Sequence, residues 1–164
     1  MGEFIAKFGD AQDKPARYRE AAEAIEATLI GETDPVARMA TVVAILKQAF
    51  EHYFWAGYYL VDPADPEQLV VGPYQGTPAC LRIAIGKGVC GTAAATGQTQ
   101  IVADVHAFPG HIACDARSES EIVVPVFDRE GLLFGVFDVD ATIPAAFDEA
   151  DGQGLRDVLR LTFA

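Results

Sequence analysis

The chain of 164 residues has little positive charge and no long apolar run. Its 12 Lys and Arg stand against 24 Asp and Glu, so the formal net charge is −12. This charge argues against nucleic acid or an anionic membrane as a partner, because both attract basic surfaces. A membrane span needs about 20 consecutive apolar residues, and the opening segment MGEFIAKFGDAQDK lacks a secretory apolar stretch. We therefore expect a cytoplasmic protein.

Cysteine is also scarce. Cys80, Cys90 and Cys114 are an odd number, which excludes a fully paired disulfide framework within one chain. Their spacing contains no CxxC motif, and adding His106 and His111 gives a poor match to a tetrahedral zinc site. A Cys–His hydrolase is an alternative, but no signature of such enzymes surrounds the cysteines. We expect no bound metal.

The positions of the three thiols favour redox chemistry. Cys114 lies among small and polar residues in a segment, 103–120, that shows neither helical nor strand periodicity. Cys90 is placed near the start of a short helix, where the helix dipole is expected to lower a thiol pKa. Cys80 lies at the boundary between a loop and a strand. One thiol could attack and become a sulfenic acid, and another could resolve it to a disulfide.

The order of predicted elements indicates one α+β domain over residues 1–164. Apolar residues recur at helical spacing in two N-terminal helices within about 15–51, the second starting at Asp34-Pro35. A sheet and its loops follow over about 54–140, and a last helix begins at Asp148 within about 148–162. Strands that follow one another through turns favour an antiparallel sheet. The shorter predicted elements are strands at 55–61, 68–71, 80–83 and 101–102, and a helix at 92–96.

A hairpin near the C-terminus brings three carboxylates together. If its loop has two or four residues, Phe127 faces Leu132 and Glu121 faces Asp138. Because side chains alternate along a strand, Asp140 shares their face. Opposed like charges destabilise a sheet, so we expect a cation, a metal or a raised carboxyl pKa there. The alternative is that these strand ends simply reach solvent. A ligand ammonium fits at least as well as a hard metal, because no calcium-loop pattern is present.

Aromatic residues precede this hairpin. Trp55 and Tyr59 are four residues apart in a predicted strand and therefore share one face. They form either a plain core pair or the wall of a small pocket, which Tyr74 in the following segment could extend.

Seven short segments of the chain combine into one pattern: WAGYY (55–59), GPYQG (72–76), AC (79–80), GKGVCGTA (86–93), GHIACD (110–115), SEIVVP (120–125) and GVFDVD (135–140). Together they resemble the free methionine-(R)-sulfoxide reductases, which are GAF-domain enzymes. The resemblance spans roughly residues 18–160. The ordered set of three cysteines with an acidic hairpin is more specific than the GAF fold, which occurs mostly in non-catalytic sensors.

The resemblance implies reduction of free L-methionine (R)-S-oxide to methionine. It makes Cys114 the thiol that attacks the sulfoxide sulfur, and Cys80 and Cys90 the recycling thiols, with Cys80 favoured as the direct resolver. The resulting disulfide is reduced by thioredoxin, with NADPH consumed upstream, and no cofactor is bound.

The resemblance also assigns the acidic and aromatic residues. Glu121, Asp138 and Asp140 hold and polarise the substrate, and Trp55 and Tyr59 surround its methyl end. It implies a GAF-like, six-stranded antiparallel sheet with helices on both faces, and a homodimer. The alternative is a non-catalytic GAF domain that senses a small molecule. A free amino acid carries an ammonium group for the carboxylates, and one of them with a raised pKa could protonate the departing oxygen.

Overall fold

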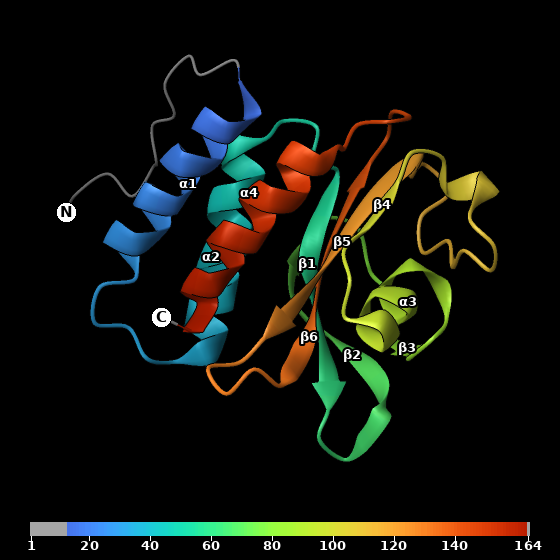
Figure 1. Cartoon of the computed structure of the whole chain (residues 1–164), viewed down its shortest axis with the longest axis horizontal. Helices are drawn as coiled ribbons and strands as arrows, with labels where there is room; N and C mark the ends of the chain where they lie inside the picture. The colour runs from blue at the N-terminus through green and yellow to red at the C-terminus, as the bar shows by residue number, and fades with distance from the viewer. Residues whose placement is uncertain (1–12, 164) are drawn as a thin grey trace.

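The computed structural model describes residues 13–163, which form one antiparallel sheet with helices on both faces. The strand order is β3-β2-β1-β6-β5-β4. Helices α1, α2 and α4 lie together on one face, and α3 lies on the other (Figure 1). The expected fold class is confirmed. The elements are α1 (Lys14–Thr28), α2 (Pro35–Ala49), β1 (Trp55–Asp62), β2 (Asp65–Gln75), β3 (Arg82–Ala84), α3 (Gly88–Thr96), β4 (Gln100–Val102), β5 (Ser120–Phe127), β6 (Leu133–Ala141) and α4 (Glu149–Leu159), with 3-10 turns at Val105–Ala107 and Arg160–Phe163.

Aspartate caps explain where three of the helices begin. The side chains of Asp13 and Asp34 each accept a hydrogen bond from the backbone N–H three residues later, at 2.8 Å. Asp148 forms a capping box with Asp151, whose side chain accepts the Asp148 N–H at 2.8 Å. These bonds satisfy N–H groups that have no partner within the helix. The predicted starts of α2 and α4 are therefore confirmed.

Alternation along β5 and β6 separates the two faces of the sheet. Ile122 and Val124 on β5 and Phe137 on β6 point into the core beneath α1, α2 and α4. Their neighbours Val123 and Val136 point to the opposite face and pack in the smaller core beneath α3. The large core supplies most of the buried apolar surface, and the smaller core supports the functional pocket.

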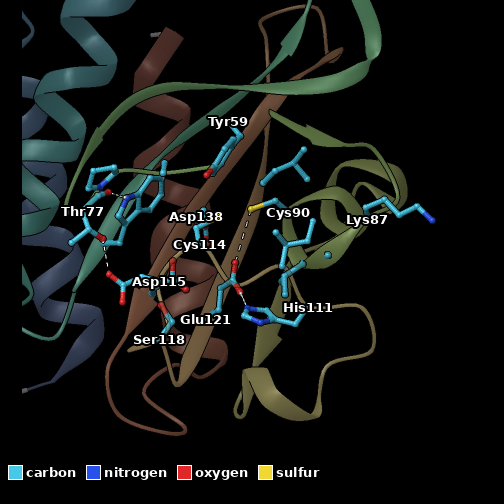
Figure 2. A pocket seen from close by; sticks show the side chains of 18 residues that line it. Tyr59, Thr77, Lys87, Cys90, His111, Cys114, Asp115, Ser118, Glu121 and Asp138 are labelled. Carbon is cyan, nitrogen blue, oxygen red and sulfur yellow. Dashed lines mark hydrogen bonds and ion pairs between the residues drawn. The ribbon is translucent and has the colours of Figure 1, made fainter. Parts of the chain in front are cut away.

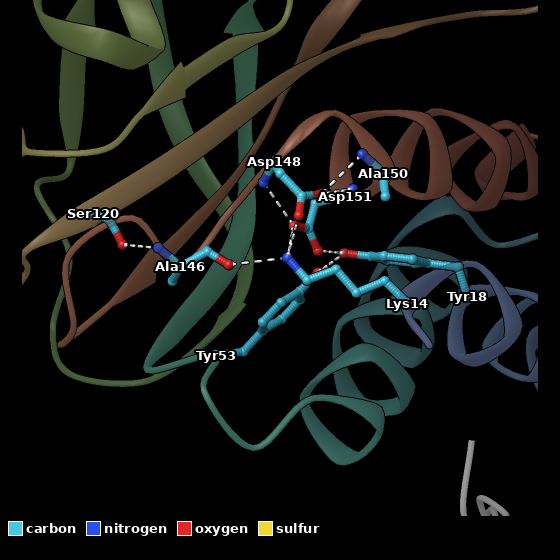
Figure 3. A network of polar contacts seen from close by, with 8 residues as sticks. All are labelled: Lys14, Tyr18, Tyr53, Ser120, Ala146, Asp148, Ala150 and Asp151. Atoms are coloured by element: carbon cyan, nitrogen blue, oxygen red, sulfur yellow. Dashed lines mark hydrogen bonds and ion pairs between the residues drawn. The ribbon is translucent and has the colours of Figure 1, made fainter. Parts of the chain in front are cut away.

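A polar network lies inside the large core and links α1 to α4 (Figure 3). The Tyr18 hydroxyl donates to Asp151 Oδ1 at 2.8 Å and also contacts the Tyr53 hydroxyl at 2.6 Å. Lys14 Nζ lies 2.6 Å from Asp151 Oδ2 and 3.1 Å from Asp148 Oδ2. The buried carboxylate of Asp151 thus has a donor for each oxygen, as burial of a charged group requires.

Strand β2 is longer than predicted. It continues through Pro73 to Gln75, where the sequence indicated a loop. The register between β1 and β2 shifts by one here, so that Gly72 and Pro73 together lie opposite Tyr58. This bulge tolerates a proline because a bulged residue leaves the regular ladder. The bounds of two other short elements also differ from those predicted. Strand β3 begins at Arg82 instead of residue 80, so Cys80 precedes it, and helix α3 begins at Gly88 instead of residue 92.

The predicted register of the β5–β6 hairpin is wrong by two residues. Gly131 adopts φ +81° in the turn after Asp128, and Phe127 pairs with Leu133 instead of Leu132. A second shift follows before Val126 pairs with Gly135, so Glu121 faces Asp140 and Val123 faces Asp138. Two shifts of one residue restore the side-chain alternation. The three carboxylates therefore still share one face, although the predicted Glu121–Asp138 pair does not form.

Candidate active site

A pocket opens on the face of the sheet that α3 covers (Figure 2). Strands β1, β5 and β6 contribute to its lining, together with α3 and residues of the segments 77–79 and 111–118. Cys80 is absent from the lining, but its disulfide joins it to Cys114, which is present. The other predicted site residues all line the pocket: Trp55, Tyr59, Cys90, Cys114, Glu121, Asp138 and Asp140.

The three carboxyl groups lie on one face of the sheet, those of Glu121 and Asp138 buried and that of Asp140 half-buried. Glu121 and Asp138 are 5% and 6% exposed, and Asp138 Oδ1 has no hydrogen-bond partner among the described residues. Burial, with a smaller contribution from Asp140, raises the pKa of Glu121 to about 8. Burial and acidic neighbours also raise the pKa values of Asp138 and Asp140 well above their usual range. Glu121 therefore holds a proton at neutral pH in the empty pocket.

The cysteines divide into a bonded pair and a free thiol. Cys80 and Cys114 form a disulfide, with their Cα atoms 5.6 Å apart. Cys90 is free and buried, and its sulfur lies 4.0 Å from Glu121 Oε1. Burial, followed by the negative charges of Asp138 and Glu121, raises the pKa of the Cys90 thiol. The expectation of a lowered Cys90 pKa is therefore wrong, because desolvation and the acids outweigh the nearby helix start.

The aromatic pair forms a stacked wall of the pocket. The ring centroids of Trp55 and Tyr59 are 5.8 Å apart, and Tyr74 stacks on the other side of Trp55 at 5.2 Å. The Trp55 indole N–H donates to the Thr77 carbonyl at 3.0 Å, which fixes the ring relative to the loop that precedes Cys80. The shared face predicted for Trp55 and Tyr59 is confirmed.

Two site residues were missed by the sequence reasoning. His111 Nε2 lies 3.4 Å from Glu121 Oε2, and burial lowers the pKa of this histidine. Asp115 accepts a hydrogen bond from the Thr77 hydroxyl at 2.9 Å and forms an ion pair with Arg117 at 2.8 Å, and its pKa is lowered by these partners. Both residues are close to Cys114 in the sequence, which could have indicated them as site residues. Sequence proximity alone does not show whether either side chain points into the pocket.

Cys90, Glu121 and Asp138 also meet the geometric requirement for a metal site. One potential ligand atom of each lies within 4.8 Å of the others. A thiolate with two carboxylates would suit a transition metal. The same cluster would equally accept a ligand ammonium group. A metal ion and an ammonium group are both cations, and either would stabilise the ionised forms of carboxyl groups whose pKa values are raised.

Comparison with known proteins places this arrangement in a family. The fold and the pocket define a GAF domain, and residues 32–161 match the model of that family. A protein named free methionine-R-sulfoxide reductase from Escherichia coli is 43% identical over 147 residues, covering 90% of this chain and 87% of that protein. The GAF domain-containing protein A of Dictyostelium discoideum is 46% identical over 148 residues, covering 90% of this chain and 91% of its own length.

A solved structure agrees in both sequence and shape. The free methionine-R-sulfoxide reductase of Neisseria meningitidis, determined in complex with its substrate, superposes with a TM-score of 0.89. The two sequences are 46% identical, and the match covers 96% of this chain and 93% of the Neisseria meningitidis chain. The present chain belongs to the GAF-domain family of free methionine-R-sulfoxide reductases. Among the described residues, the helices are too short or too polar to cross a membrane.

Proposed function

We propose that this protein reduces free L-methionine (R)-S-oxide to L-methionine. One observation carries the proposal: Cys114, which is paired with Cys80, and a cluster of three carboxyl groups line the same small pocket. The first supplies the electrons and the second supplies a charged recognition site. The name of the Escherichia coli relative and the substrate complex of the Neisseria meningitidis relative support the same reaction.

The carboxyl groups select a free amino acid. An ammonium group that approaches Asp138 and Asp140 stabilises their ionised forms while Glu121 keeps its proton, and Asp138 Oδ1 is available to accept one of its hydrogen bonds. A methionine sulfoxide within a polypeptide has an amide in place of the ammonium. It would leave the three acids without a cation, so the same residues discriminate against protein substrates.

The aromatic wall accommodates the apolar end of the substrate. Trp55 and Tyr59 are buried and stacked on the β1 side of the pocket. A methylsulfinyl group that packs on these rings would have its sulfur between the wall and the loop of Cys114. Sulfur–aromatic contacts of this kind are favourable by about 0.3–1.5 kcal/mol.

The thiols carry the electrons in two balanced steps. The Cys114 thiolate attacks the sulfoxide sulfur while a proton is delivered to the sulfoxide oxygen. The protonated oxygen then passes to the Cys114 sulfur as its bond to the substrate sulfur and the transient sulfur–sulfur bond break, which leaves methionine and a Cys114 sulfenic acid. The Cys80 thiol then attacks the Cys114 sulfur, a disulfide forms and water leaves. The substrate gains two electrons and the two thiols lose them. The Cys80–Cys114 disulfide corresponds to the end of this sequence and supports Cys80 as the resolving thiol.

Recycling needs an external dithiol. Cys114 is exposed in its loop, so a protein thiol can approach its sulfur, and we infer that thioredoxin reduces the pair with NADPH consumed upstream. The buried Cys90, with its raised pKa, is a poor exchange partner, so we assign it a secondary part in recycling. We further propose a cytoplasmic homodimer, in which the exposed Ile30 and Val36 at the α1–α2 turn would meet the partner.

The decisive experiment is a coupled assay. Thioredoxin, its reductase and NADPH are mixed with the protein and either epimer of free methionine sulfoxide. We expect NADPH oxidation with the (R) epimer alone, and its loss in C114S. Dithiothreitol in place of thioredoxin separates recycling from chemistry. Binding without turnover of either epimer would overturn the proposal and favour a small-molecule sensor.

A further inference from the structure

We propose that His111 is a positioning residue that acts through Glu121: it holds the Glu121 carboxyl group toward the pocket and relays its proton to and from solvent. The inference rests on the proposed function, because it concerns the proton that the reaction delivers to the sulfoxide oxygen. It adds a residue outside the set of thiols, acids and aromatics described above.

The geometry of the pair is the first argument. His111 Nε2 lies 3.4 Å from Glu121 Oε2, and the two side chains are 13% and 6% exposed (Figure 2). Glu121 is fixed at the start of β5, where it pairs with β4 and β6, whereas His111 comes from the loop that carries Cys114. Catalytic hydrogen bonds are often long in an empty site and tighten when the substrate binds. The contact thus couples the loop of the attacking thiol to the acid at the sheet.

The protonation states of the pair are the second argument. Burial raises the pKa of Glu121 and lowers the pKa of His111, so near neutral pH the shared proton resides on the carboxyl group and the imidazole is neutral. The ion pair expected from the residue types is therefore replaced by a carboxylic acid beside an imidazole acceptor. The other titratable or charged groups that line the pocket are Tyr59 from β1, Cys90 and Lys87 from α3 and its start, Asp138 and Asp140 from β6, and Asp115 and Cys114 from the loop.

The proton balance of the reaction is the third argument. Cys114 releases its thiol proton to become the attacking thiolate, and Glu121 gives a proton to the sulfoxide oxygen as the sulfenic acid forms. Glu121 must then regain a proton before the next turnover, but it is almost completely buried. His111 lies between Glu121 and the more exposed part of the loop, and an imidazole can accept a proton at one nitrogen while donating from the other.

The chain contains a matched control for this pair. His106 Nε2 also lies 3.4 Å from a glutamate oxygen, that of Glu119, and it belongs to the same segment. These side chains are 62% and 41% exposed, and neither residue lines the pocket. Replacing His106 should therefore leave the reaction unchanged, although it breaks a histidine–glutamate pair of the same length.

The test is single-turnover kinetics of the reduced protein with free methionine (R)-sulfoxide. Trp55 is the one tryptophan of the chain and lines the pocket, so its fluorescence reports occupancy and turnover. We expect H111A to slow the single-turnover rate by about 10–100-fold and to flatten its pH profile, with the rate restored at least about fivefold by added imidazole. H106A should match the wild type.

Three other outcomes overturn the inference. One is a normal rate for H111A. Another is a slow H111A that imidazole does not restore while H111Q recovers the rate, since a residue that only supports the loop needs no titratable ring. Absence of turnover by the wild type overturns the proposed function and this inference together. Thermal unfolding of both alanine variants separates these results from loss of the fold.

Discussion

Asp151 and Asp138 are both buried aspartates, but their surroundings differ in a way that separates structure from function. Asp151, beneath α1, is fully buried and receives hydrogen bonds from Lys14 at 2.6 Å and Tyr18 at 2.8 Å. Asp138, beneath α3, is 6% exposed, and its Oδ1 has no partner among the described residues. Its buried neighbours are another carboxyl group and a thiol.

The contrast concerns what completes each cluster. A buried carboxylate without a partner destabilises the fold, so such groups are retained where a ligand supplies the missing charge or donors. The α1 side is completed by the chain itself, through a lysine and a tyrosine. The α3 side is left for a cation to complete. Its three acids accordingly have raised pKa values, and an ammonium group would return those of Asp138 and Asp140 toward the usual range.

The largest effect that would test this contrast is expected for D138N. The amide keeps the shape of the side chain but cannot ionise to meet the substrate ammonium. We expect kcat/KM for free methionine (R)-sulfoxide to fall by about 100–1,000-fold, which corresponds to about 3–4 kcal/mol. Because Asp138 Oδ1 is buried without a hydrogen-bond partner, the unfolding midpoint in urea should remain unchanged or rise. A stability loss as large as the activity loss would contradict the assigned difference between the two clusters.

The second largest effect is expected for D151N, which should lower the stability of the fold and leave the reaction rate nearly unchanged. Removing this charge leaves Lys14 without its closest acid and weakens the bonds from Tyr18 and the Asp148 N–H. We expect a loss of about 3 kcal/mol in the free energy of unfolding, because one partner of a buried pair is removed. The single-turnover rate should stay within about twofold of the wild type. D157N on the same helix, where the aspartate is exposed, is the control and should cost less than about 0.5 kcal/mol.

The helix starts on the α1 side depend on local patterns and could be predicted from the sequence. The bonds from Lys14 and Tyr18 to Asp151 join residues 137 and 133 positions apart, and no local pattern predicts them. Asp34-Pro35 and Asp148 mark helix starts because a cap needs one side chain and a backbone N–H two or three residues away. The shared face of Glu121, Asp138 and Asp140 was also predictable, because strand alternation has a period of two. Neither inference needs knowledge of distant packing.

Several features on the α3 side of the sheet could not be predicted from the sequence, because they depend on packing between residues that are distant in the chain. The opposed pair is Glu121 with Asp140 because two register shifts near the turn add up, and neither shift has a signal strong enough to place it. The pKa of Cys90 rises because α3 buries it against the acids of β5 and β6, which a helix-start argument alone misses. His111 reaches Glu121 through a loop without periodicity, so its direction could not be inferred from spacing.

The smallest of the three effects is a pH dependence of stability that belongs to the α3 side. The pKa of Glu121 is raised from 4.5 to about 8, so between these values the folded protein holds a proton that the unfolded chain releases. Stability from this group is therefore complete below about pH 4.5 and is lost as the pH rises toward 8. His111 contributes the opposite slope below its ordinary pKa, because burial lowers its folded value. Comparing the wild type with E121Q cancels that common contribution.

The measurement is urea unfolding of the disulfide-bonded protein at pH 6 and pH 8. For a single group with these pKa values, the wild type should lose about 2 kcal/mol more than E121Q over that interval. D151N should show the same pH dependence as the wild type, because Asp151 and its donors Lys14 and Tyr18 lie on the opposite face of the sheet from Glu121. An equal slope for the wild type and E121Q would mean that Glu121 is already ionised at pH 6. Glu121 would then hold no proton in the empty pocket, and the proton that His111 is proposed to relay would have to come from another group.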